Sequence, residues 1–227
     1  METMFDRTQT LIGKENVEIL KEKKVIVFGI GGVGGYVVEM LARAGIENLT
    51  LVDNDVVSIS NLNRQIIALN STVGKPKVEA MKARIMDINP NAKVKAIQNF
   101  VTKDNVEELN LKNYDFVIDA IDNVTAKLAI AKTCDDNEIN FISCMGTGNK
   151  INTSGFKICD IYKTSGCPLA RAIRQNAQKI KIKKMQVLYS QEQPYKTGER
   201  VPSSICYVPS MAGIMIAEYV IKKMLNL

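Results

Sequence analysis

Short apolar runs alternate with longer amphipathic segments along the first 145 positions of the chain. The apolar runs predict strands at 25–28, 49–52, 94–97, 116–120 and 140–144. The segments between them predict helices at 35–44, 77–88 and 126–137, after a short first helix at 15–23. Continuous apolar runs are typical of parallel strands that are covered on both faces. The alternation therefore predicts an α/β fold with a doubly wound, mostly parallel, Rossmann-like sheet.

The pattern changes after residue 150. Two more strands are expected in "GFKICDIY" and "KMQVLYS", with a helix at 169–179 between them. A polar loop at 190–204 and an amphipathic helix at 211–225 complete the chain. We therefore expect a core at 1–150 and a smaller C-terminal α/β extension at 151–227. The last helix is too short and too charged for a membrane span, so none is expected.

Composition removes several classes of chemistry. The 227 residues include no histidine, which excludes Ser-His and Cys-His nucleophile pairs. Five cysteines without C-x-x-C spacing predict neither a disulfide framework nor a zinc site. A cytoplasmic protein is expected. Cys134, Cys144 and Cys159 are expected to be structural and Cys167 to be an unreactive loop thiol or, alternatively, an exposed one, while Cys206 stays undecided.

Positive charge is concentrated in one segment. Residues 171–200 carry eight basic and two acidic groups, and their net charge of +6 equals the net charge of the whole chain. Such a segment is either a solvated face or a contact surface for a polyanion. If it binds a nucleic acid, the expected residues are Arg171, Arg174, Lys179, Lys181, Lys183 and Lys184.

A glycine-rich loop follows the first predicted strand. In "VIVFGIGGVGG", Gly29, Gly31 and Gly34 match a dinucleotide-binding fingerprint, in which a close backbone and a helix N-terminus hold phosphate. Asp53 ends the second predicted strand, where a carboxylate accepts hydrogen bonds from ribose hydroxyls. These features alone are compatible with NAD.

Charged residues after the later strands favour a different ligand. "DNDVVSISNLNRQ" ends in Arg64 and Gln65, Lys77 begins a helix, and Asp122 follows the strand that ends near Asp119. Glycine amides, cations and a carboxylate at one sheet edge suit a nucleoside triphosphate with Mg²⁺. An NAD oxidoreductase is disfavoured, and a non-catalytic nucleotide-binding scaffold remains open.

The motifs "GIGGVGG", "DNDVVSISNLNRQ", "GKPKVEAM" and "DAIDNVTAK" together resemble the ubiquitin-activating-enzyme-like adenylation family over about residues 5–145. The resemblance implies ATP and Mg²⁺, with Arg7, Arg64, Lys77 and Asp122 as catalytic residues. Asp122 would hold the metal, and Arg7 would reach the ATP of a neighbouring subunit in a homodimer. The implied nucleotide-binding residues are Gly29, Gly31, Gly32, Gly34, Asp53, Asp55, Ser60, Asn61, Arg64, Gln65, Lys77, Asp122 and Asn123.

The second half of the chain resembles the branch of this family that contains the tRNA threonylcarbamoyladenosine dehydratases. This resemblance implies that the threonyl carboxylate is activated as an acyl-adenylate and that its side chain then closes on itself, with net loss of water. The basic segment would contact tRNA phosphates. The alternative is an adenylyltransferase that activates a ubiquitin-like sulfur-carrier partner.

Overall fold

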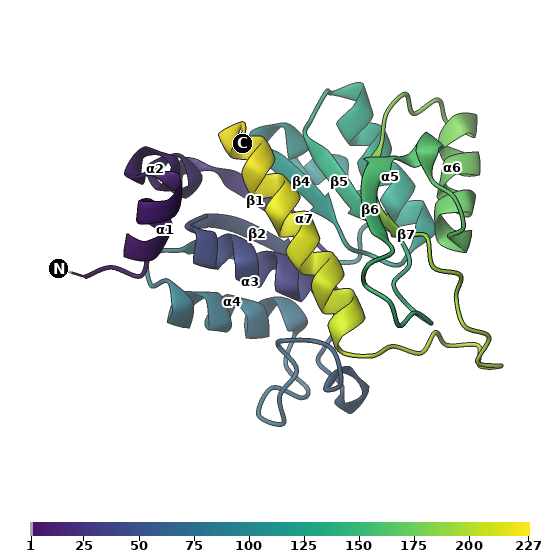
Figure 1. Cartoon of the computed structure of the whole chain (residues 1–227), viewed down its shortest axis with the longest axis horizontal. Helices are drawn as coiled ribbons and strands as arrows, with labels where there is room; N and C mark the ends of the chain where they lie inside the picture. The colour runs from purple at the N-terminus through teal and green to yellow at the C-terminus, as the bar shows by residue number, and fades with distance from the viewer. Residues whose placement is uncertain (1) are drawn as a thin grey trace.

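The computed structural model describes residues 2–227 and contains a single seven-stranded sheet in that part of the chain (Figure 1). The strands lie in the order β3-β2-β1-β4-β5-β7-β6, and β6 pairs antiparallel with β7 while the other pairs are parallel. The mostly parallel, doubly wound sheet predicted from the sequence is confirmed. The strands are β1 (Lys24–Phe28), β2 (Asn48–Val52), β3 (Lys93–Ile97), β4 (Phe116–Asp119), β5 (Phe141–Cys144), β6 (Phe156–Asp160) and β7 (Gln186–Ser190).

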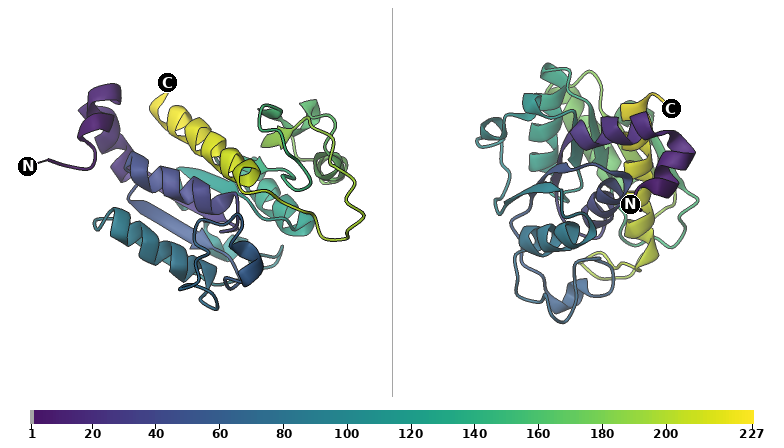
Figure 2. Two further views of the ribbon diagram at one scale, coloured as in Figure 1. Left: turned by 60° about the horizontal axis from the view of Figure 1, so that its bottom comes forward. Right: turned by 90° about the vertical axis from the view of Figure 1, so that its left-hand side faces the viewer.

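Helices cover both faces of the sheet (Figures 1 and 2). The α-helices are α1 (Asp6–Ile12), α2 (Lys14–Glu22), α3 (Gly34–Ala44), α4 (Lys77–Ile88), α5 (Val124–Asp136), α6 (Pro168–Lys179) and α7 (Tyr207–Leu225). Short 3₁₀ turns occupy η1 (Ile59–Asn61), η2 (Glu107–Leu109), η3 (Leu111–Asn113) and η4 (Ile161–Lys163).

Alternation along β1 decides which face each side chain covers. Val25 and Val27 are buried in a cluster with α3, α4 and α7, whereas Ile26 and Phe28 are buried with α5 on the other face. Successive residues of a strand point to opposite faces, so one apolar run supplies two cores. This double burial explains why the strand reads as a continuous apolar run.

The C-terminal segment adds to the same sheet. β7 pairs with β5 and carries β6 on its outer side, while α7 crosses one face of the sheet and packs against α3 (Figure 1). The polar segment 191–206, here called the strap, connects β7 to α7. Among residues 2–227, no helix is both long and apolar enough to cross a lipid bilayer.

Two helices differ most from the sequence expectations. α1 was not expected, and α7 begins at Tyr207 instead of Met211. α1 has no buried residue of its own, so periodicity gave little signal for it. Val208 and Ala212 of α7 are completely buried, so tertiary packing extends this helix toward the strap.

Candidate active site

A cavity of about 640 Å³ lies at the carboxyl ends of the parallel strands. Loops after β1, β2, β4 and β5 line it, together with the start of α6 and the strap. The residues expected to bind the nucleotide that do line it are Gly29, Gly31, Gly32, Asp53, Asp55, Asn61, Arg64, Gln65, Lys77 and Asp122. Carboxyl ends of strands in open α/β sheets are the usual place for a ligand.

The glycine loop is shaped by two close approaches of the backbone. Gly29 has a φ of +84°, and a Cβ there would lie 2.8 Å from the carbonyl carbon of Ala120. A Cβ at Gly34 would lie 1.8 Å from the carbonyl oxygen of Gly29. Gly34 therefore closes the loop by packing and does not line the cavity. A Cβ at Gly31 would meet nothing closer than 3.7 Å, so this position leaves open space on the cavity side.

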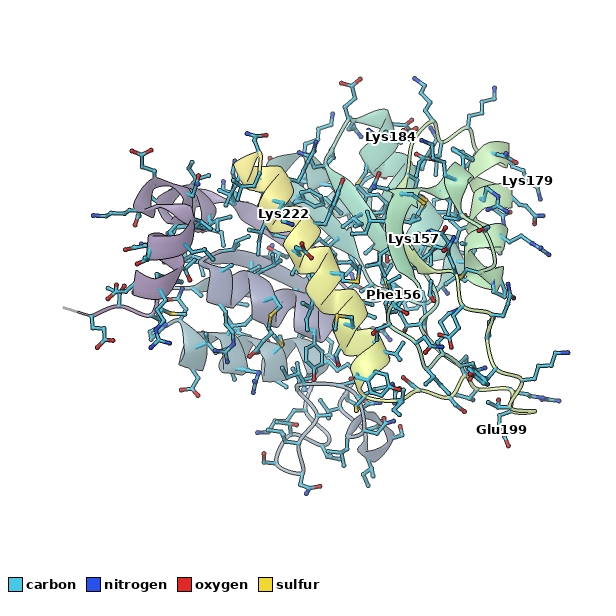
Figure 3. All side chains as sticks on the ribbon, viewed as in Figure 1. Phe156, Lys157, Lys179, Lys184, Glu199 and Lys222 are labelled. Atoms are coloured by element: carbon cyan, nitrogen blue, oxygen red, sulfur yellow. The ribbon has the colours of Figure 1, made fainter. Side chains whose placement is uncertain are left out.

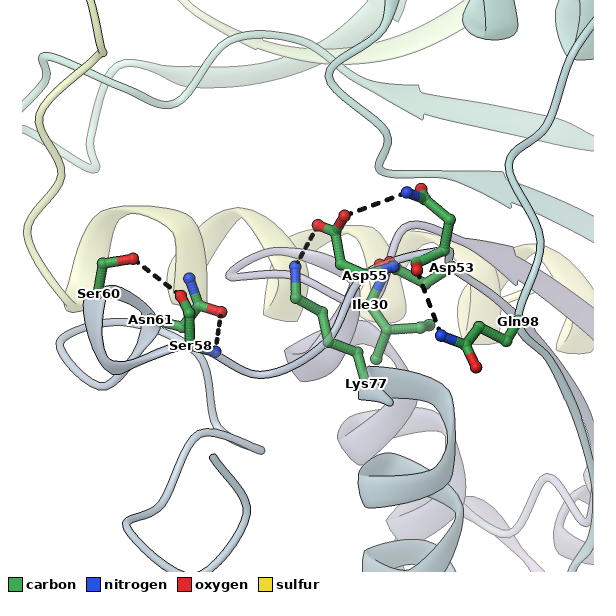
Figure 4. Close-up of polar contacts among 9 residues, drawn as sticks. Ile30, Asp53, Asp55, Ser58, Ser60, Asn61, Lys77 and Gln98 are labelled. Atoms are coloured by element: carbon green, nitrogen blue, oxygen red, sulfur yellow. Dashed lines mark hydrogen bonds and ion pairs between the residues drawn. The ribbon is translucent and has the colours of Figure 1, made fainter. Parts of the chain in front are cut away.

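Asp53 is held by the loops on either side of it (Figure 4). Its Oδ2 accepts a hydrogen bond from the Ile30 amide at 2.6 Å, and its Oδ1 accepts one from the Asp55 amide at 2.8 Å. Burial raises the pKa of the Asp53 carboxyl, although these two amides and the nearby Lys77 oppose the shift. Asp53 thus links the glycine loop to the end of β2 and lines the cavity where a ribose would need acceptors.

Lys77 supplies a buried cation at the start of α4 (Figure 4). Its side chain is 7% exposed, and its Nζ lies 2.7 Å from Oδ2 of Asp55, which is more than half exposed. Because water reaches the Asp55 carboxylate and weakens the ion pair, the carboxylate neutralises the charge of the lysine only in part. The ammonium is therefore a suitable partner for a phosphate oxygen.

Arg64 and Gln65 follow the η1 turn. Arg64 Nη1 donates to the Ser60 carbonyl at 2.7 Å and to Asn63 Oδ1 at 2.8 Å. Gln65 is buried, and its Oε1 has no hydrogen-bond partner among residues 2–227. Buried amides are nearly always paired, and an amide group can be turned to offer its NH₂ instead. The unpaired Gln65 amide, the glycine cradle and Lys77 fit a phosphate-bearing ligand.

Asp122 and Asn123 have different environments. Asp122 is exposed and lines the cavity. Asn123 is the N-cap of α5, where its Oδ1 accepts a hydrogen bond from the Ala126 amide at 3.0 Å, and it does not line the cavity. No group of three or more His, Cys, Asp and Glu side chains gathers as a metal site within residues 2–227. The donor set fits Mg²⁺, which commonly takes one carboxylate together with substrate phosphates and water.

Three other predicted groups lie outside the cavity. Ser60 is exposed, and its hydroxyl lies 2.9 Å from that of Ser58. Arg7 is exposed on α1, which lies with α2 at the opposite, amino-terminal end of the strands (Figure 1). The third group comprises the basic residues Arg171, Arg174, Lys179, Lys181, Lys183 and Lys184, which do not line the cavity.

The basic residues differ among themselves. Lys179 and Lys184 project from the side of the molecule formed by α6 and the turn after it (Figure 3). Arg174 is half-buried, and its Nη1 donates to the carbonyl and the hydroxyl of Thr164 at 2.8 and 2.7 Å. Its guanidinium therefore fixes the loop before α6, and the exposed residues around it carry the charge of this face.

Below the cavity lies a polar cluster that the sequence reasoning missed. Lys127, Asp119 and Ser143 are each 0% exposed. Lys127 Nζ donates to Asp119 Oδ2 at 2.9 Å, to Ser143 Oγ at 3.1 Å and to the Cys144 carbonyl at 2.7 Å. Asp119 Oδ1 also accepts from the Ile121 amide at 2.9 Å. The cluster thus joins the loops after β4 and β5, both of which line the cavity.

A signal for this cluster was present in the sequence. Lys127 lies on the same helical face as Ile130, Ala131 and Cys134, all of which are buried. A lone lysine on an apolar helical face indicates a buried partner, because an unpaired charge there would be costly.

The far half of the cavity is formed by 144–150, 167–169 and residues of the strap. Cys167 is 4% exposed at the N-cap of α6, so the alternative of an exposed thiol is wrong. Cys144 is also buried, and burial raises the pKa of its thiol to about 12. Lys150 lines this half and is 4% exposed; the sequence reasoning did not single it out.

Comparison with known proteins agrees with this geometry. The ThiF family model matches residues 5–227. A tRNA threonylcarbamoyladenosine dehydratase of Bacillus subtilis is 42% identical over 240 residues, which cover 98% of this chain and 94% of that protein. A molybdopterin-synthase adenylyltransferase of Escherichia coli is 35% identical over 126 residues, covering 56% of this chain and 50% of the relative.

Solved structures give the same result. The Escherichia coli tRNA N6-threonylcarbamoyladenosine dehydratase has been solved in complex with ATP, and it matches with a TM-score of 0.92 and 34% identity. That match covers 98% of this chain and 94% of the other. The complex of the same enzyme with AMP matches with a TM-score of 0.93. The glycine cradle, the cations around it and these similarities along almost the whole chain lead to one assignment: the chain belongs to the ThiF family.

Proposed function

We propose that this protein is an ATP-dependent tRNA threonylcarbamoyladenosine dehydratase. The observation that carries the proposal is a single cavity with two parts. One part offers a glycine cradle and cations for a triphosphate, and the other extends toward Lys150 and α6. Similarity over 98% of the chain to a dehydratase, and to a structure that binds ATP, supports this reading.

In the first step, a carboxylate oxygen of the threonyl group attacks the α-phosphorus of ATP. The bond to the β,γ-phosphates breaks, pyrophosphate leaves, and an acyl-adenylate forms. Arg64 and Lys77 stabilise the charge on the phosphates, and the glycine loop positions them. Asp122 would hold Mg²⁺, which neutralises phosphate charge when it is bound.

In the second step, a nucleophilic atom of the same side chain attacks the activated carbonyl carbon. The bond between this carbon and the AMP oxygen breaks, AMP leaves, and the attacking group loses a proton. The net change in the nucleoside is the loss of one water. The absence of histidine from the sequence is compatible with this route, because the attacking carboxylate is already ionised and ring closure depends on proximity.

The proposal extends to partners. The exposed basic residues around α6 would contact tRNA phosphates, which predicts binding that weakens as salt increases. Arg7 lies in α1 and does not line the cavity of its own chain, so its proposed role requires the cavity of a second copy in a homodimer. The proposed location of the enzyme is the cytoplasm, where its tRNA substrate is found.

The test is ATP turnover by the purified protein with tRNA that carries threonylcarbamoyladenosine. We expect AMP release that depends on the modified tRNA, together with a nucleoside lighter by one water. tRNA without the modification is the control. Turnover only with a Gly-Gly-tailed carrier protein would instead support the adenylyltransferase alternative, which the partial match to the molybdopterin-synthase enzyme favours.

A further inference from the structure

Lys150 is a buried cation without an ion pair. Its side chain lines the far half of the cavity, and the residue is 4% exposed. Within residues 2–227, the two other buried lysines each pair with a carboxylate: Lys77 with Asp55 at 2.7 Å and Lys127 with Asp119 at 2.9 Å. Lys150 Nζ donates only to the backbone carbonyl of Glu192. A buried charge without a counter-ion is unfavourable, so its retention needs a reason.

The nearby carboxylate is used elsewhere. Glu192 accepts hydrogen bonds from the amides of Ile151, at 3.1 and 3.2 Å, and Asn152, at 3.0 Å. It also accepts one from Asn152 Nδ2 at 3.2 Å. Burial lowers the pKa of Lys150, and the Cys167 thiol and then the Glu192 carboxylate only partly oppose this shift. Two of the three ammonium hydrogens are thus left for a ligand.

A second positive feature borders the same space. α6 is a 12-residue helix, and its N-cap residue Cys167 makes no side-chain capping hydrogen bond. Cys167, Pro168 and Leu169 all line the cavity. A Cβ on Gly146 would lie 3.7 Å from Leu169 Cβ, so the loop that leads to Lys150 packs on the first turn of α6. The N-terminus of a helix attracts anions through its free amides and its dipole.

We propose that Lys150 and the N-terminus of α6 form an anion subsite for an oxyanion of the acceptor. The inference rests on the proposed function, because that function supplies an acceptor with two oxyanions near the modified base: the threonyl carboxylate and the flanking nucleotide phosphate. The phosphates of ATP have their own cations, Arg64 and Lys77, at the other end of the cavity. Lys150 therefore recognises a second anion.

Equilibrium binding tests the subsite separately from turnover. The enzyme is saturated with an ATP analogue whose α,β-phosphate link cannot be cleaved. It is then titrated with threonylcarbamoyladenosine nucleoside, with its carboxyl methyl ester, and with an anticodon stem-loop RNA that carries the modification. The variants are Lys150→Met, Lys150→Gln and Lys150→Arg, with Lys163→Met as the matched control because Lys163 is exposed in η4 near α6.

Removal of the ammonium is expected to weaken acceptor binding at least about tenfold, as for a lost hydrogen bond to a charged group. Lys150→Arg should restore most of the affinity, and Lys163→Met should match the wild type. The Kd of the ATP analogue should change less than about twofold in every variant. Lys150→Gln keeps a polar tip and guards against a folding defect in Lys150→Met.

The probes separate the two anions. A loss seen with the free nucleoside but not with its ester identifies the carboxylate, whereas a loss seen only with the stem-loop identifies the flanking phosphate. Unchanged affinity for both nucleoside and stem-loop in Lys150→Met and Lys150→Gln overturns the proposal. So does a wild-type protein that binds neither. A wild type that binds the nucleoside in a Lys150-dependent way, but releases no AMP when given ATP and the modified tRNA in the turnover test, would defeat the proposed function and leave the subsite standing.

Discussion

The two halves of the cavity use buried charge in opposite ways. In the half of the cavity proposed for ATP, after β1, β2 and β4 and here called the nucleotide half, Lys77 pairs with Asp55 and Asp53 is held by two backbone amides. In the far half, proposed for the acceptor and here called the acceptor half, after β5 and before α6, Lys150 donates a hydrogen bond only to a carbonyl. The nucleotide half is braced by its own contacts, whereas the acceptor half keeps an uncompensated cation. Lys77 would therefore meet a phosphate with a carboxylate partner already in place, whereas Lys150 has no counter-ion until a ligand supplies one.

The largest expected effect concerns the fully buried pair below the cavity. Lys127→Met leaves Asp119 buried without its partner, so the free energy of unfolding should fall by about 3–5 kcal/mol. Urea denaturation measures this change. Lys132→Met is the matched control, because Lys132 pairs with Asp136 at the surface of the same helix, and it should cost less than about 1 kcal/mol. Similar losses in both variants would contradict the structural role of the pair.

The second effect concerns ligand binding in the nucleotide half. Lys77→Met should weaken the binding of ATP by about 1.5–3 kcal/mol, or roughly 10- to 150-fold in Kd, because a hydrogen bond to a charged group is lost. Calorimetric titration measures the Kd. Lys75→Met is the matched control, because Lys75 is exposed and does not line the cavity. This variant should bind ATP as tightly as the wild type does. Equal weakening in both would mean that general charge, not the buried lysine, attracts the nucleotide.

The third effect is a small change in the free energy of unfolding, opposite in sign to the one expected for Lys127→Met. Lys150→Met should leave the ligand-free protein as stable as the wild type or up to about 1 kcal/mol more stable, because cavity water screens the removed charge. Burial lowers the pKa of Lys150 from 10.5, which means that the charged lysine destabilises the folded wild-type protein. As pH rises through the lowered folded-state pKa toward 10.5, the lysine becomes neutral and the difference between the two proteins should shrink.

Denaturation of both proteins at neutral and at alkaline pH checks this expectation. A clear loss of stability in Lys150→Met at neutral pH would show that the lysine braces the acceptor half, as Lys127 does below it. The comparison between the two halves would then fail.

The last prediction concerns the different reactivity of two cysteine thiols, Cys206 and Cys144. Cys206 is exposed at the end of the strap, whereas Cys144 is buried and burial raises its pKa to about 12. Iodoacetamide at pH 8 should therefore modify Cys206 in the folded protein and spare Cys144, since the thiolate is the reactive form. Peptide mass spectrometry gives the sites, and denatured protein is the control. Rapid labelling of Cys144 would indicate that the acceptor half opens to solvent.

Local patterns in the sequence were sufficient for most of the nucleotide half. Gly29, Asp53 and Lys77 follow strands or begin helices whose apolar periodicity is clear, and parallel strands place their carboxyl ends at one edge. The alternation of strand and helix also predicted a mostly parallel sheet, which the structure has, but it did not predict the order of the strands. Residues close together in the sequence were thus enough to predict this half of the cavity.

The acceptor half depends on contacts between distant segments. The Asn149 amide donates to the Ser203 carbonyl at 2.8 Å, and the Ser203 amide donates to Asn149 Oδ1 at 2.6 Å, which holds the strap against the loop after β5. These contacts join positions 54 residues apart, and no periodicity connects them. The strap therefore helps to form a half of the cavity that the sequence reasoning did not describe.

The sequence by itself determined the strands, most of the helices and the glycine loop with its charged neighbours, because these follow from residue spacing within single elements. Only the tertiary structure decided which charged and polar side chains are buried and which are paired. It committed Asn123 to a helix cap and Arg174 to a loop, and it left Lys150 without a counter-ion. Burial is a property of the segments that pack over a residue, and at this cavity those segments come from distant parts of the chain.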